Sequence, residues 1–277
     1  IAVDVVDDEV VMAWVGPTAD VLQVQRFTKS GAPESEAFEV TSGDGPVGRI
    51  DVVPYDEGFI VFWDHDDDTD GGGIRAQRYD SDLSPWGTQL QVNQDILGDQ
   101  RFGGAVVFDD LSFLVVYEDE TGDNTSFGIR AQRFDSDLNP AGDAISVNQI
   151  TDGDQRLPDV ARFPDGSWAV AWVGPGQTVF TRAFTNDGLP LAGSGEIPAN
   201  ITTAADQTRP SGAATADGAT VFVAWESPKF VGKETEVIGR LFSASGQPKS
   251  GEIQVNQYIT NSQAWPSVAG GPAQFAV

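Results

Sequence analysis

The hydrophobic residues of this chain fall into short runs in which every second position is large and apolar. The clearest run covers residues 167–173, where Trp168, Val170 and Trp172 alternate with smaller side chains. Alternation with a period of two, rich in β-branched and aromatic residues, is typical of a β-strand. No stretch of ten or more residues shows the 3.6-residue period of a helix. The pattern therefore predicts an all-β protein.

Four such runs, separated by turn residues, make up one repeat. Between the first and second runs, Asp165-Gly166 is a dipeptide typical of a hairpin turn, and we expect Asp217-Gly218 and Glu57-Gly58 to occupy the same place. Between the third and fourth runs, proline fixes φ and glycine permits left-handed backbone. In the repeat that begins at Pro158, the expected strands cover residues 159–163, 167–173, 179–184 and 196–200.

The repeat recurs from one end of the chain to the other, with a period of roughly 50 to 55 residues. Several phrases are written twice, including I-R-A-Q-R at 74–78 and 129–133, and G-D-Q-R at 98–101 and 153–156. An aromatic residue that we expect in the core closes the second run of each repeat: Trp14, Trp63, Tyr117, Trp172 and Trp225.

A four-stranded repeat of this length is the blade of a β-propeller. We expect one propeller domain over residues 1–277, with five full repeats and a partial sixth. We also expect the glutamine of the G-D-Q-R phrase to hold backbone amides of the neighbouring blade. The repeats have bounds near 1–48, 49–100, 101–155, 156–207, 208–263 and 264–277.

Charge narrows the range of partners. The chain has 16 Lys and Arg against 42 Asp and Glu, and its formal net charge is −26. Such a field repels nucleic acid and anionic membranes and attracts cations. There is no cysteine, which excludes disulfides and thiolate metal sites. No apolar run approaches the ~18 residues of a membrane span, so we expect none.

Two acidic loops between the second and third runs are candidate calcium sites. Alternate carboxylates followed by glycine, as in Asp66-x-Asp68-x-Asp70-Gly71, can wrap hard oxygen ligands around Ca²⁺. The alternative is that these are solvated hairpin tips in an acidic chain. The candidate ligands are Asp64, Asp66, Asp68 and Asp70 in the first loop and Glu118, Glu120 and Asp123 in the second.

The sequence contains no recognisable catalytic constellation. A Ser-His-Asp triad would have to use His65, the one histidine. Paired carboxylates for glycoside hydrolysis remain open, because spacing in sequence does not give separation in space. Trp86 and Trp265 depart from the repeat, and each is either packed or an exposed platform for a sugar ring.

The phrase at 129–142, followed by V-N-Q at 147–149 and G-D-Q-R-L-P-D-V-A at 153–161, resembles repeats of large secreted bacterial proteins. These are FG-GAP-like propeller proteins and calcium-dependent adhesins of the RTX type. The resemblance covers nearly the whole chain and is best over 74–172. It implies an extracellular or cell-surface module with calcium in its acidic loops. The loop at 66–71 departs from the fuller FG-GAP pattern, which has a further carboxylate where Ile74 stands.

The sequence therefore favours a non-enzymatic extracellular propeller that acts in adhesion or builds a surface assembly. Its expected partners are a glycan, a cell-surface protein, or further copies of the chain joined through the incomplete last blade. A chain cut from a longer repeat protein would explain the half blade equally well. Two alternatives are a lectin-like propeller that binds carbohydrate and, less favoured, a glycoside hydrolase on a propeller scaffold.

Overall fold

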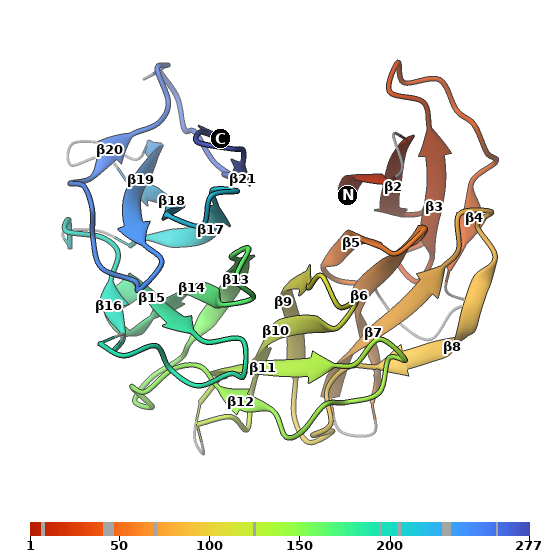
Figure 1. Ribbon diagram of the computed structural model, residues 1–277, viewed down its shortest axis with the longest axis horizontal. Coiled ribbons are helices and arrows are strands. Elements are labelled where there is room, and N and C mark those ends of the chain that lie inside the picture. Colours follow the sequence, from red (N-terminus) through yellow and green to blue (C-terminus); the bar gives the residue numbers. More distant parts are fainter. Residues whose placement is uncertain are drawn as a thin grey trace. The chain divides into compact units, whose positions relative to one another are not determined.

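The computed structural model describes residues 1–6, 9–40, 47–68, 71–123, 126–193, 195–203, 206–228, 234–258 and 260–277. Two of the acidic residues singled out above fall partly or wholly outside this description: the side chain of Asp68 and all of Asp70. Short antiparallel strands dominate the described ranges, and Pro175–Gln177 forms a 3-10 turn, η1 (Figure 1). In those ranges no helix has the length and apolarity needed to cross a membrane.

The chain divides into two compact units. The first comprises Ile1–Thr121 and Gln132–Ala144, and the second comprises Gly122–Ala131 and Ile145–Val277. Each is described by itself below. The sequence prediction of a single domain stays a prediction.

The first compact unit contains two complete four-stranded sheets whose strand order follows the sequence. Two further strands, β9 (Gln100–Val107) and β10 (Phe113–Asp119), pair antiparallel in the same unit. The first sheet contains β1 (Ala2–Val6), β2 (Glu9–Val15), β3 (Leu22–Phe27) and β4 (Phe38–Glu39). The second contains β5 (Ile50–Tyr55), β6 (Gly58–Asp68), β7 (Gly71–Tyr79) and β8 (Pro85–Gln91).

The second compact unit repeats this arrangement twice, again in sequence order. One sheet contains β13 (Arg156–Arg162), β14 (Trp168–Gly174), β15 (Thr178–Phe184) and β16 (Ile197–Pro198). The next contains β17 (Thr208–Ala214), β18 (Thr220–Pro228), β19 (Thr235–Ser243) and β20 (Ile253–Gln254). A two-stranded pair follows, β21 (Ala269–Gly270) and β22 (Phe275–Ala276).

Strands β11 (Gly128–Phe134) and β12 (Ile145–Ser146) complete the sheet order β9-β10-β11-β12, and the boundary between the compact units falls within β11. The all-β class and the four-stranded repeat predicted from the sequence are therefore confirmed. In the repeat used for the prediction, the first three strands lie within three residues of the expected bounds, and the fourth is shortened to Ile197–Pro198.

The fourth strand is short because an asparagine side chain replaces backbone pairing at its end. The Oδ1 atom of Asn200 accepts the backbone N–H of Val179 at 2.9 Å, and its Nδ2 atom donates to the carbonyl of Thr202 at 2.7 Å. The side chain thus ends the strand while satisfying an N–H near the start of β15. Equivalent asparagines accept from equivalent N–H groups in other repeats: Asn93 from Ile74, Asn148 from Ile129 and Asn256 from Val237.

Of the three predicted hairpin turns, two place a glycine in the left-handed conformation and the third does not. Gly166 has φ of 82° and Gly218 has φ of 69°, as the Asp-Gly dipeptides predict. The prediction for Glu57-Gly58 is wrong, because Tyr55 pairs with Gly58 and the left-handed residue is Asp56, with φ of 54°. Asp tolerates this region better than most residues, so a tighter turn forms one position earlier.

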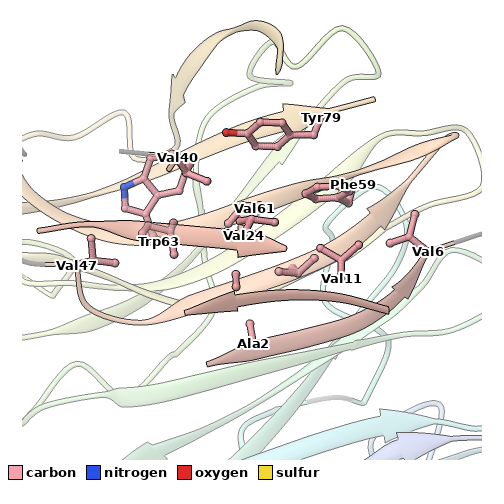
Figure 2. Packing of buried hydrophobic residues seen from close by; sticks show 13 residues of the cluster. Ala2, Val6, Val11, Val24, Val40, Val47, Phe59, Val61, Trp63 and Tyr79 are labelled. Carbon is pink, nitrogen blue, oxygen red and sulfur yellow. The ribbon is translucent and has the colours of Figure 1, made fainter. Parts of the chain in front are cut away.

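Aromatic residues fill the core between neighbouring sheets. Trp63, Tyr117, Trp172 and Trp225 are buried as predicted, whereas Trp14 is only partly buried. Figure 2 shows one such cluster in the first compact unit, where Trp63 and Phe59 of β6 lie among aliphatic side chains of neighbouring strands.

In the second compact unit, the recurring glutamine forms a hydrogen bond to the buried tryptophan of the core. The sequence predicted instead that it holds backbone amides of the neighbouring blade. Gln155 Oε1 accepts the indole N–H of Trp172 at 3.0 Å, and its Nε2 donates to the carbonyl of Ile150 at 3.1 Å. Gln207 accepts from Trp225 in the same way, at 2.9 Å. A buried indole N–H needs such an acceptor, so the glutamine is a packing device.

Replacing Asn200 by Ala should destabilise the protein by about 1–3 kcal/mol, because the buried N–H of Val179 loses its acceptor. The measurement is the denaturation midpoint. Ile201→Ala is the control, since the neighbouring Ile201 side chain is 59% exposed. Equal midpoints for Asn200→Ala and the control would contradict the capping role.

Candidate functional site

The first compact unit has a polar cleft where β6, β7 and β9 meet, and its volume is about 250 Å³. Three consecutive residues of β6 reach it, together with β7 and the segment that leads into β9. The lining residues are Val47, Gly48, Asp64, His65, Asp66, Gly72, Asp99, Gln100 and Arg101.

Asp64 lies at the junction of three strands. It follows the buried Trp63 in β6, so strand alternation turns it away from that aromatic layer. Its Oδ1 atom accepts the backbone N–H of Phe102 in β9 at 2.5 Å, and its Oδ2 atom accepts that of Arg49 at 3.0 Å. The carboxyl group therefore joins one four-stranded sheet to the start of the next.

Burial has the largest effect on the pKa of the Asp64 carboxyl group. It raises the pKa of this carboxyl from its ordinary value of 3.8 to about 6. The N–H groups of Phe102 and Arg49 and the Arg49 charge act in the opposite direction, while the charge of Glu118 adds to the rise. A carboxyl group that still holds its proton near pH 5 can act as an acid.

Asp99 presents a second carboxylate to the same cleft. Its Oδ1 atom accepts the backbone N–H of Gly72 at 3.1 Å, and its Oδ2 atom accepts from Arg101 Nη2 at 2.9 Å. Its own N–H donates to Glu120 at 2.8 Å. The carboxylate is thus fixed in position by a guanidinium and a backbone donor while 39% of the side chain stays exposed.

A buried glutamate holds the arginines that surround the cleft. Glu118 is 1% exposed and accepts from Arg49 Nη2 at 2.9 Å, with Arg101 Nη1 at 4.0 Å. Arg49 also donates to the carbonyl of Phe102 at 2.7 Å. Because both arginines are partly solvated, we expect these ion pairs to set geometry more than to add stability.

Several of the residues predicted to bind calcium accept hydrogen bonds from other groups of the protein. Asp66 is exposed at the cleft, Glu120 accepts the N–H of Asp99, and Asp123, in the second compact unit, accepts from Asn148 Nδ2 at 2.6 Å. The side chain of Asp68, and Asp70 entirely, lie outside the described residues. Among the residues that the structure describes, no three carboxylate or histidine side chains form a metal-binding group. Calcium binding stays a prediction.

The two predicted sugar platforms are both exposed, to different degrees. Trp86 is 39% exposed and Trp265 is 74% exposed. An arginine lies over each ring: the Arg78 guanidinium carbon is 4.8 Å from the Trp86 centroid, and that of Arg209 is 4.0 Å from the Trp265 centroid. Neither ring lines the cleft.

The sequence favoured packing for the Gly-Asp-Gln turn at 98–100, which contains Asp99, with ligand binding as the alternative, and it did not single out Arg101. Both belong to the repeated G-D-Q-R phrase, which was interpreted as packing because it recurs. The recurrence is real, since Arg156 bonds Asp154 at 3.1 Å in the next repeat. The signal that could have separated the two copies is the acidic β6 loop in front of Asp99.

The sequence matches no protein family and no curated protein. Solved structures with the same fold include an α-L-arabinofuranosidase from Lactobacillus brevis, 10% identical, with a TM-score of 0.56 over 93% of this chain and 95% of that one. A polysaccharide lyase of family PL25, an ulvan lyase, is 11% identical, with a TM-score of 0.63 over 98% and 74%. Hydrazine synthase from Kuenenia stuttgartiensis is also 11% identical, with a TM-score of 0.63 over 94% and 67%.

These likenesses support the propeller-like repeat fold but not membership of the FG-GAP or RTX-adhesin proteins. They also correct the predicted function. The non-enzymatic reading, with its adhesive, structural and filament-forming roles, is wrong, because the fold neighbours include glycoside hydrolases and a polysaccharide lyase. At these identities the likeness shows the fold, so activity has to be argued from the cleft.

Replacing Asp64 by Asn should change stability in a way that depends on pH. The folded pKa of Asp64, about 6, lies above the ordinary 3.8, so its protonation stabilises the fold fully below pH 3.8. That contribution is lost as pH rises through 6, and it amounts to about 3 kcal/mol. The stability of Asp64→Asn relative to the unsubstituted protein should therefore increase by about 2 kcal/mol between pH 4 and pH 7.

Urea denaturation at several pH values measures this difference. Asp159→Asn is the matched comparison, since burial also raises the pKa of Asp159 to about 6 and this residue lies outside the cleft. A relative stability of Asp64→Asn that stays flat between pH 4 and pH 7 would show that the pKa of Asp64 is not raised.

Proposed function

We propose that this protein is a glycoside hydrolase that cleaves a neutral polysaccharide in the cleft of the first compact unit. The observation that carries the proposal is the pairing in one cleft of a carboxyl with a raised pKa, Asp64, and a carboxylate fixed by donors, Asp99. Hydrolysis of a glycosidic bond requires one carboxylic acid and one carboxylate.

Asp64 has the properties of the general acid. Its proton would pass to the glycosidic oxygen as the bond from that oxygen to the anomeric carbon breaks. The backbone N–H groups of Phe102 and Arg49 orient the carboxyl group, and burial keeps it protonated at mildly acidic pH. Each oxygen has two lone pairs, so accepting one N–H leaves the acid free to donate its proton.

Asp99 supplies the second carboxylate, on the side of the anomeric carbon. Arg101 and Gly72 hold it in place by hydrogen bonds to its two oxygens. In an inverting reaction, Asp99 accepts a proton from the water that adds to the anomeric carbon. In a retaining reaction, Asp99 itself bonds to the anomeric carbon, and the ionised Asp64 accepts the proton of the water that then displaces it. The reaction then balances as the addition of one water molecule across the broken bond.

Charge favours a neutral substrate over an acidic one. Asp64, Asp66 and Asp99 line the cleft beside the single cation Arg101, and the whole chain carries a net charge of −26. Such a field repels the uronic acids that polysaccharide lyases cleave. Since polymeric glycans are met outside the cell, we also propose an extracellular or surface location. Arabinans and galactans are suitable first substrates.

Asp64→Asn should lower the rate of glycan cleavage by about 100-fold or more, the usual contribution of a general acid. Activity should fall as pH rises through about 6, because Asp64 loses its proton there. The assay measures reducing ends released from soluble arabinan, β-galactan, xylan and mannan between pH 4 and pH 8.

Asp159→Asn is the control in this assay as well. It removes a carboxyl group of similar pKa that does not line the cleft, and it should retain activity. An unsubstituted protein that cleaves none of the four polysaccharides, or an Asp64→Asn variant as active as Asp159→Asn, would refute the proposal.

A further inference from the structure

The second compact unit carries an aromatic surface built from Glu226, Arg209 and Trp265, which we call the Trp265 platform. The Trp265 side chain is 74% exposed, the most exposed tryptophan in the described chain. The Arg209 guanidinium stacks on one face of its ring, 4.0 Å from the centroid. Most of the side-chain surface nevertheless remains exposed to solvent.

Every component of the platform is held in place. Glu226 is 3% exposed, and its Oε2 atom accepts from Arg209 Nη1 at 2.8 Å. Its Oε1 atom accepts the backbone N–H of Trp265 at 2.7 Å. One buried carboxylate thus fixes both the guanidinium and the backbone that bears the indole, which lowers the entropic cost of binding.

The segment before Trp265 is anchored separately. Gln263 N–H donates to the carbonyl of Thr235 at 2.8 Å, and Thr235 Oγ1 donates to the carbonyl of Gln263 at 2.9 Å. These bonds tie residues 260–265 to the start of β19. A large apolar ring held rigidly in water is an unusual use of a tryptophan, because packing would bury it.

Arg209 and Trp265, whose side chains are in contact, share the same backbone conformation. Arg209 and Trp265 both precede a proline and occupy the same position of consecutive repeats. Both have left-handed backbone, with φ of 49° and 62°. This conformation is rare for such residues and persists where surrounding contacts impose it. Leu157, the equivalent residue of the preceding repeat, has φ of 54° and carries no aromatic ring.

We infer that the Trp265 platform is a binding site for a neutral sugar ring, separate from the cleft that would cleave the glycan. A flat indole face matches the apolar C–H face of a pyranose or furanose. Arg209 is already neutralised by Glu226, and the net charge of −26 opposes an anionic ligand. The inference rests on the proposed substrate class, a neutral glycan, but not on cleavage.

The test is affinity electrophoresis in gels containing soluble arabinan, β-galactan, xylan or mannan, with polygalacturonate as the anionic comparison. The protein carries Asp64→Asn so that cleavage cannot remove the ligand. At least one neutral polysaccharide should retard it, and adding Trp265→Ala should weaken that binding at least tenfold, a difference of about 1.4 kcal/mol. Trp265→Phe should restore part of it.

Tyr258→Ala is the control, because Tyr258 is an aromatic residue of the same compact unit that is 79% exposed and does not belong to the platform. It should leave binding unchanged, and melting curves should show that all variants fold. Binding that survives Trp265→Ala, absence of binding to all four neutral polysaccharides, or preference for polygalacturonate would overturn the inference. Trp265-dependent binding without any cleavage by the unsubstituted protein would refute the hydrolase proposal alone.

Discussion

Carboxylate side chains that accept backbone N–H groups of a neighbouring repeat connect the four-stranded sheets of this structure. Within the second compact unit, Asp159 accepts from Gly212 at 2.8 Å, and Glu252 accepts from Thr202 at 2.9 Å. Neighbouring four-stranded sheets pack through side chains and cannot extend one another by strand pairing, so their facing N–H groups need acceptors. The acidic composition of the chain supplies such acceptors.

The same interaction creates the candidate site. A carboxyl group that joins two sheets must lie between them, where water is scarce and the ionised form is disfavoured. Asp64 and Asp159 both show this effect, with pKa values raised to about 6. They differ in access, since Asp64 opens to a cleft of about 250 Å³ with Asp99 on its wall. A structural acid becomes a chemical candidate when a substrate can reach it.

Much of the fold could be predicted from the sequence because its signals are local. Alternation and recurring turn phrases depend on neighbouring residues, and they gave the strand bounds of β13, β14 and β15 to within three residues. The backbone conformation of a turn is harder to predict, because the preference of the turn residue competes with the contacts that the repeat imposes. Leu83 and Leu138 take left-handed backbone, with φ of 68° and 64°, at the position where Gly188 and Gly246 stand in other repeats. The repeat enforces the turn even where the residue opposes it.

The site was less predictable because it depends on contacts between residues far apart in sequence. Arg49 and Glu118 are 69 positions apart and bond at 2.9 Å, which no local pattern indicates. The calcium prediction counted charges along a loop, but Asp64 instead uses both oxygens on backbone N–H groups. Whether the remaining acidic side chains of this loop bind calcium stays a prediction, because Asp70 and the side chain of Asp68 lie outside the described residues.

Repetition also explains how one scaffold could acquire two kinds of sugar contact. The residue after the core aromatic is Asp64, Glu118, Val173 or Glu226 in successive repeats. In two of these repeats the carboxylate accepts the N–H of a residue in the next repeat, as Asp64 does for Phe102 and Glu226 does for Trp265. The anchored residue is buried in the first case and 74% exposed in the second. Because the carboxylate bonds the backbone N–H in both cases, the side chain of the anchored residue can differ. It packs in the core at Phe102 and lies at the surface at Trp265.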